Sequence, residues 1–145
     1  MADQTHADIV IDAPPAEVMD VIADLAKYPE WSDGVKSAEV LKTGADGRPS
    51  DARLRVEAGP IRDTYELAYE WNGDESVTWQ LTKSGVLKSQ DGTYTLEDNG
   101  DGTTTVIYDL TIELNVPMIG MLKKRAEKSV VETALNGLKK RVENG

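Results

Sequence analysis

Cysteine and phenylalanine are absent from this chain, and histidine occurs once. Without cysteine there is no disulfide, no thiolate nucleophile and no cysteine-ligated zinc site. A histidine-dependent catalytic triad or metal site would depend entirely on His6, which is more simply interpreted as an exposed residue at the end of a strand. We therefore expect neither a metal ion nor a cofactor.

Long apolar runs are missing as well. The purely apolar stretches are too short to span a membrane, and the N-terminal residues MADQTHAD have neither the basic region nor the apolar core of a secretory signal. We therefore expect a cytoplasmic protein with no integral membrane segment. The 145 residues are enough for one hydrophobic core and too few for two domains of usual size, so a single domain over residues 1–145 is expected.

The net charge of −10 disfavours nucleic acid as a partner, because a phosphate backbone would be repelled. The charge is unevenly placed, since a basic cluster lies near the start of the last predicted helix, where the helix dipole disfavours cations. Transient contact with a membrane surface or an acidic partner is one interpretation, and compensation of the acidic sheet is the other. The oligomeric state is left open, with a monomer favoured. The cluster consists of Lys123, Lys124, Arg125 and Lys128.

The periodicity of apolar residues predicts the order of the elements. Residues 5–12 alternate as a strand does, and the next segment, from Pro14 to about Ala26, has the one-sided apolar stripe of a short helix. Another short helical turn is expected at residues 30–32. From residue 35 to 116 the period of two returns, broken by short turns, which predicts about six antiparallel strands. Residues 118–142 show helical spacing and predict one long helix.

These elements predict an α+β domain in which a curved antiparallel sheet of about seven strands wraps around the long C-terminal helix. Short helices separate the first two strands. The sheet and the helix each have one apolar face, so the two faces pack together. A concave sheet has more area than one helix covers, and a gap is therefore expected between them.

The segment IVIDAPPAEVMDVIADLAKYPEWSDGVKSAEVL resembles the start of the START-like (SRPBCC) superfamily, in particular its polyketide cyclase/dehydrase or lipid-transport branch. Asp24, Tyr28, Pro29 and Trp31 carry its Asp-x-x-x-Tyr-Pro-x-Trp turn, and the likeness extends to the terminal helix. The resemblance implies a helix-grip fold with a deep hydrophobic cavity between sheet and helix. Members bind lipids, sterols, quinones or plant metabolites, and some cyclise polyketides. The motif builds the fold and does not choose between carrier and enzyme.

Aromatic residues gather on the predicted inward phase of the strands, where Trp71 also falls. Tyrosine offers an apolar ring and a hydroxyl, which suits an amphiphilic or aromatic ligand, although core packing is the alternative. Trp31 is expected near the cavity mouth. The full set of predicted ligand-binding residues is Trp31, Leu54, Val56, Tyr65, Leu67, Tyr69, Trp79, Tyr94, Tyr108, Ile119 and Leu122.

No catalytic residue is assigned from the sequence. Most carboxylates fall on the polar phase of the strands, but the strand containing Glu39 lacks clean alternation, so Glu39 could point inward. A buried carboxylate beside tyrosines could act as a general acid or base. The weak catalytic candidates are Glu39, Tyr65, Tyr69 and Tyr94.

Three functions remain open. The first is binding or carrying a hydrophobic small molecule, such as a lipid, a quinone or a polyketide-like metabolite, without catalysis. The second is a polyketide cyclase or dehydratase of the aromatase type acting in the same cavity, which requires an inward acid or base within reach of a tyrosine. The third is a protein-interaction module without a ligand, which requires a filled core and an exposed apolar patch.

Overall fold

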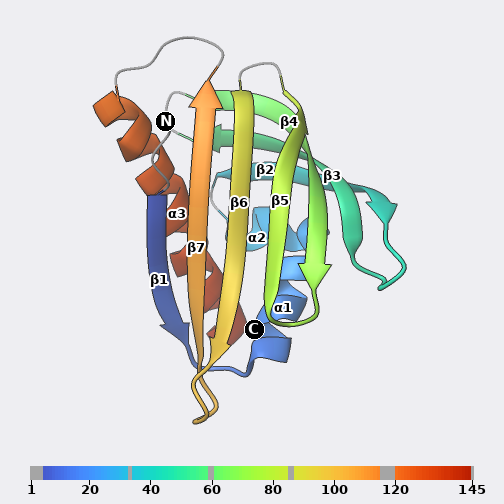
Figure 1. Ribbon diagram of the computed structural model, residues 1–145, viewed down its shortest axis with the longest axis vertical. Helices are drawn as coiled ribbons and strands as arrows, with labels where there is room; N and C mark the ends of the chain where they lie inside the picture. Colours follow the sequence, from blue (N-terminus) through green and yellow to red (C-terminus); the bar gives the residue numbers. More distant parts are fainter. Residues whose placement is uncertain (1–4, 33, 59–60, 85–86, 115–119, 145) are drawn as a thin grey trace.

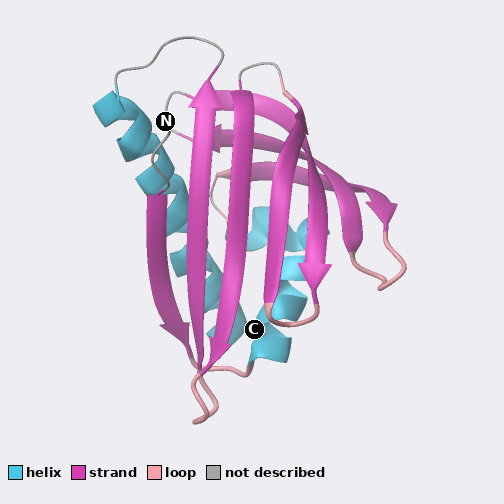
Figure 2. Ribbon diagram, viewed as in Figure 1, coloured by secondary structure: helices cyan, strands magenta, loops and turns pink. Residues whose placement is uncertain are grey.

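A computed structural model describes residues 5–32, 34–58, 61–84, 87–114 and 120–144 of the chain. These residues form one sheet and a set of helices that lie on its concave side (Figures 1 and 2). In chain order the elements are β1 (Thr5–Ile11), α1 (Pro15–Ala23), the 3-10 helix η1 (Leu25–Lys27), α2 (Tyr28–Trp31), β2 (Val35–Thr43), β3 (Pro49–Ala58), β4 (Ile61–Asn72), β5 (Ser76–Lys83), β6 (Leu87–Asp98), β7 (Thr104–Leu114) and α3 (Gly120–Asn144).

The sheet is antiparallel throughout and has the strand order β1-β7-β6-β5-β4-β3-β2. Strands β2 to β7 are neighbours in sequence and in space, whereas β1 pairs with β7, from Thr5 opposite Leu110 to Ile11 opposite Thr104. The chain therefore crosses from one edge of the sheet to the other through α1, η1 and α2. This arrangement confirms the predicted α+β class and the helix-grip fold.

The predicted first helix is interrupted. The structure ends α1 at Ala23 and begins η1 at Leu25, because Asp24 leaves the helical conformation with φ −84° and ψ 70°. Its backbone N–H still donates to the carbonyl groups of Asp20 and Val21, which closes the last turn.

Within the described residues, no helix is both long and apolar enough to cross a membrane.

α3 packs mainly on one side of the concave face. Val131, Leu135 and Leu138 are buried, and their spacing of three or four places them on one face of the helix. Its strand contacts are mainly with β1 and β7. The concave side of β3 to β6 therefore remains available to α1 and α2, and to any space that the helices do not fill.

Glu127 joins the N-terminal half of α3 to two strands. Its carboxylate is buried and accepts hydrogen bonds from the Thr5 hydroxyl at 2.8 Å and from the Ile112 backbone N–H at 2.7 Å. The pairing of β1 with β7 reaches only to Leu110, so the N–H of Ile112 lies beyond the last described pair. A helix side chain thus supplies the acceptor that a neighbouring strand would otherwise provide.

The C-terminal half of α3 is held by different contacts. The Lys139 ammonium donates to the Val10 carbonyl at 2.8 Å, and the Glu143 carboxylate accepts from the Asp12 backbone N–H at 2.9 Å. At Gly137 the helix approaches α2 so closely that an added Cβ would lie 2.3 Å from the Trp31 carbonyl oxygen. Only glycine allows this approach, since the obstructing atom belongs to the backbone.

We expect Glu127→Ala to lower the free energy of unfolding by about 2–3 kcal/mol, because it leaves a backbone donor and a hydroxyl buried without their acceptor. Urea unfolding followed by far-UV circular dichroism measures the change. Glu132→Ala, an exposed glutamate on the same helix, is the matched control and should stay within about 0.5 kcal/mol of wild type. Equal stability of the two variants would show that Glu127 does not hold α3.

Candidate functional site

A cavity of about 270 Å³ lies between the concave face of the sheet, α2 and α3. Its volume is close to the lower end of the range for small-molecule sites. Its wall is formed by the α1–β2 region, by inward residues of the strands and by one side of α3. These residues are Ile22, Tyr28, Trp31, Ser32, Gly34, Val35, Leu54, Val56, Glu57, Tyr65, Leu67, Tyr69, Trp79, Gln90, Tyr94, Tyr108, Ile112, Ser129, Val130, Thr133 and Ala134.

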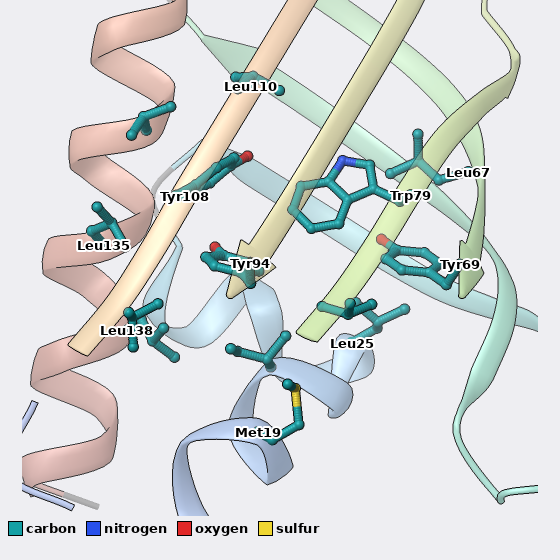
Figure 3. Close-up of a cluster of buried hydrophobic side chains, with 14 of the residues drawn as sticks. Met19, Leu25, Leu67, Tyr69, Trp79, Tyr94, Tyr108, Leu110, Leu135 and Leu138 are labelled. Atoms are coloured by element: carbon teal, nitrogen blue, oxygen red, sulfur yellow. The ribbon is translucent and has the colours of Figure 1, made fainter. Parts of the chain in front are cut away.

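The strand register brings the aromatic residues of the wall together. Tyr69 on β4 lies opposite Trp79 on β5, and Tyr94 on β6 lies opposite Tyr108 on β7. The ring centroids of Tyr69 and Trp79 are 6.0 Å apart, and those of Tyr94 and Tyr108 are 4.6 Å apart. Trp79 links the two pairs, since its ring lies 5.3 Å from Tyr94 and 5.6 Å from Tyr108 (Figure 3). Four strands thus share one aromatic cluster.

Gly92 on β6 creates the space for this cluster. It pairs with Trp79, and a Cβ added at Gly92 would lie 2.3 Å from atoms of the indole ring. The ring therefore lies directly over the backbone of β6, as is common where a strand glycine lets a neighbour approach closely. Any larger residue at this position would displace Trp79 and change the shape of the cavity wall.

The hydroxyl groups of the wall remain protonated near neutral pH. Burial raises the pKa of Tyr65 to about 12, against a partly opposing effect of its hydrogen bond with Gln90. Burial also raises the pKa values of Tyr69, Tyr94 and Tyr108 above the ordinary range, and it is the largest cause for each. Protonated hydroxyls can donate hydrogen bonds to a ligand, and they are poor bases near neutral pH.

The three tryptophans differ in how their indole N–H groups are satisfied. The Nε1 atoms of Trp31 and Trp79 are buried and have no hydrogen-bond partner among the residues that the structure describes. Trp71 donates from Nε1 to the Pro49 carbonyl at 2.6 Å. Its ring stacks on Tyr69 and lies under the Arg48 guanidinium, so Trp71 faces inward as predicted but lies outside the cavity wall.

Charged groups are scarce in the wall. Among its described residues only Glu57 is charged, and this carboxylate lies 3.4 Å from the Arg62 guanidinium. Glu39 is exposed on β2 and lies 3.3 Å from Arg53, so the inward orientation that the sequence left open is wrong. The sequence left this orientation open because β2 pairs irregularly with β3. The pairing shifts register three times, which destroys the alternation along β2.

The other sequence predictions for the wall can be placed residue by residue. Ile119 lies outside the described residues, and the side chain of Leu122 is not described either. Whether the wall residues contact a ligand stays a prediction. Those that the structure brings to the cavity wall are Trp31, Leu54, Val56, Tyr65, Leu67, Tyr69, Trp79, Tyr94 and Tyr108.

Some wall residues were missed from the sequence. Gln90 is buried and has the same strand phase as Tyr94, so alternation on β6 could have identified it. Ser129 and Thr133 are four residues apart on one side of α3, next to the apolar stripe. Tyr28 belongs to the turn motif, and its hydroxyl donates to the carbonyl group of Ile22.

A second hollow lies on the outside, between β1 and α3. It is bordered by the exposed cations Lys124, Arg125 and Lys128, by His6, and by Glu132, which lies 3.9 Å from Lys128, and we call it the basic groove. The His6 imidazole lies 2.5 Å from the Asp109 carboxylate, and this hydrogen bond raises the pKa of His6. The side chain of Lys123 is not among those described. Within the described ranges no group of three His, Asp or Glu residues is arranged to hold a metal ion.

Comparison with known proteins places the chain in a family. A comparison with curated protein sequences gives no match. Among solved structures, a START superfamily protein from Mycobacterium smegmatis is similar, with a TM-score of 0.91, 23% identity and 97% of each chain covered. A protein from Thermus thermophilus has a TM-score of 0.85, 23% identity and 98% of each chain covered.

An aromatase/cyclase from a Streptomyces species has the same fold, with a TM-score of 0.83, 14% identity and coverage of 99% of this chain and 95% of that one. These identities show a shared fold and do not transfer an activity. The family model for polyketide cyclase / dehydrase and lipid transport matches residues 3–143, nearly the whole chain. The protein therefore belongs to the polyketide cyclase / dehydrase and lipid transport family.

Proposed function

We propose that this protein binds and carries a hydrophobic small molecule in the cavity between the sheet, α2 and α3. The observation that carries the proposal is the cavity itself, about 270 Å³ of space with a wall of aromatic and aliphatic side chains. Close packing is the rule in protein interiors, so a space of this size is typical of a ligand site. Membership of a family that includes lipid-transport proteins supports this function.

Catalysis in the cavity is the alternative. The fold of the Streptomyces aromatase/cyclase and the several tyrosine hydroxyls in the wall favour it, since protonated hydroxyls can bind the carbonyl groups of a polyketide. The reaction also needs a base, and the raised pKa values disfavour that role for Tyr65, Tyr69 and Tyr94. Glu57, the one carboxylate among the described wall residues, lies beside Arg62. Binding without turnover is therefore the function that the site supports best.

The interaction-module alternative has less support. It requires an exposed apolar patch, but the exposed large apolar residues among those described are Val10 and Val40. Val10 lies on β1 and Val40 on β2, at opposite edges of the sheet, so they do not form one patch.

The basic groove supports a transient contact with an anionic membrane surface, through Lys124, Arg125 and Lys128. This contact would bring the carrier to a source of hydrophobic ligand, since clustered cations attract acidic lipids. Contact of the groove with an acidic protein is the competing explanation.

We expect Ala134→Trp to weaken binding of the neutral fluorescent probe N-phenyl-1-naphthylamine by about tenfold or more, because a large ring at this wall position fills the cavity. Probe fluorescence measures the affinity. Asn136→Trp is the matched control on the exposed side of the same helix, and it should bind the probe as the wild type does. Binding by Ala134→Trp as tight as by the control would show that the probe does not enter the cavity.

Alkaline titration tests the protonated state of the wall. The pKa values of all five tyrosines are raised, so the folded protein should form no tyrosinate near pH 10, where unfolded tyrosine ionises. The tyrosines hold their protons more tightly in the folded state than in the unfolded state. Their contribution to the free energy of unfolding is therefore fully present below about pH 10, and it is lost as the pH rises through the folded pKa values. Tyrosinate absorbance and far-UV circular dichroism should therefore change together in one transition. Ionisation near pH 10 without loss of structure would show that the tyrosines are accessible.

Sedimentation with lipid vesicles tests the basic groove. We expect the wild type to sediment with phosphatidylglycerol vesicles at low salt and not with phosphatidylcholine vesicles. The double variant Arg125→Glu/Lys128→Glu should lose this binding. Lys36→Glu/Lys42→Glu, which changes the net charge equally but lies on the exposed edge strand β2, should keep most of it. Equal loss in both variants would mean that total charge decides, and not the groove.

A further inference from the structure

Trp79 lies in the middle of the aromatic cluster that forms part of the cavity wall. Its ring centroid is 6.0 Å from that of Tyr69, 5.3 Å from that of Tyr94 and 5.6 Å from that of Tyr108 (Figure 3). Only 5% of the residue is exposed, although it borders the cavity. The indole ring therefore fills space on the concave face that would otherwise belong to the cavity.

Gly92 determines how close to the sheet this ring can lie. The two residues are partners in the register of β5 and β6. The three atoms nearest to a Cβ built at Gly92 are Cε2, Cζ2 and Nε1 of Trp79, and all three are closer than atoms can pack. The indole thus occupies the place of the missing side chain and lies directly on the backbone of β6.

This arrangement has two local costs for the folded state. A glycine in the interior of a strand loses much conformational freedom on folding and contributes no side-chain packing. The Nε1 atom of Trp79 is enclosed and has no hydrogen-bond partner among the residues that the structure describes. Packing therefore determines where the ring lies. What the arrangement supplies is depth, because a ring set low against the sheet leaves the space above it open.

From these contacts we infer that Trp79 and Gly92 together set the upper limit on the size of the ligand. Gly92 lets the indole lie low enough for a cavity of about 270 Å³ to remain, and the indole prevents the cavity from being larger. This inference rests on the proposed function and makes it more specific. The volume is near the lower end for drug-sized ligands, so the ligand class is a short single-chain or small-ring compound, and a lipid with two long acyl chains is excluded.

The test uses the 1-alkanols from 1-hexanol to 1-dodecanol, which differ only in chain length, as competitors of N-phenyl-1-naphthylamine. In the wild type, each added methylene group should tighten binding by about fourfold until the chain fills the cavity. Further methylene groups gain no buried contact and should add nothing. We call the longest chain that still gains affinity the cut-off length.

Trp79→Leu should raise the cut-off length by about two methylene groups, because the space of the indole becomes available to the ligand. Trp79→Phe keeps part of the ring and should raise it less, and this milder variant provides the same readout if Trp79→Leu does not fold. Trp71→Leu is the matched control. It removes an inward tryptophan that lies outside the cavity wall, so the cut-off length should not change.

Gly92→Ala tests the other member of the pair, with the opposite expected direction. Its methyl group should push the indole into the cavity, lower the cut-off length and lower the urea midpoint of unfolding. In the Trp79→Leu background the obstructing ring atoms are gone, so Gly92→Ala should change the midpoint little. Far-UV circular dichroism measures this coupling without any ligand, and rescue by Trp79→Leu is informative even if Gly92→Ala alone does not fold.

The outcomes separate this inference from the proposed function. If the alkanols displace the probe but Trp79→Leu and Trp79→Phe keep the wild-type cut-off length, the inference is overturned while the proposed function stands. An affinity that rises without a cut-off through 1-dodecanol in the wild type, or an equal loss of stability from Gly92→Ala in both backgrounds, would also overturn it. If no alkanol displaces N-phenyl-1-naphthylamine and Ala134→Trp binds that probe as the wild type does, the proposed function fails first.

Discussion

The architecture depends on a mismatch of area between one helix and a curved sheet of seven strands. α3 packs mainly on β1 and β7, which leaves much of the concave face of β3 to β6 without a helix over it. Glu127 holds one half of the helix, and Lys139 with the close approach at Gly137 holds the other. Because the helix is fixed beside one edge of the sheet, it does not fill the space over β4 and β5. The cavity is the consequence.

The wall of this cavity contains several hydroxyl groups and, among its described residues, one charged side chain. Raised pKa values keep the tyrosine hydroxyls protonated, and two indole N–H groups have no partner among the described residues. A carrier and a cyclase can share such a wall, since both bind carbonyl groups or other acceptors. The two functions differ in whether a base stands beside the donors. Among the described wall residues, Glu57 is the one carboxylate that could serve as such a base, and it lies beside Arg62.

The sequence predicted most of the fold because the strands from β3 onwards alternate over most of their length, and alternation determines which side chains face inward. It left the orientation of Glu39 open, because β2 lacks clean alternation and its pairing with β3 shifts register three times. It also missed Glu127, a buried carboxylate in a basic stretch, whose partners Thr5 and Ile112 are 122 and 15 residues away in sequence. Nor does alternation distinguish a cavity wall from filled core, as Trp71 shows.

The pairing of β1 with β7 has a consequence for how the chain is made. Thr5 lies opposite Leu110, so the first strand finds its place only after more than a hundred further residues have been added. Until then β1 has neither its strand neighbour nor the helix that covers it, and the meander from β2 to β6 has an open edge at β6. Contacts of such long sequence separation make folding slow. During synthesis on the ribosome, the sheet is therefore completed only after β7 has been made, and β1 takes its place last.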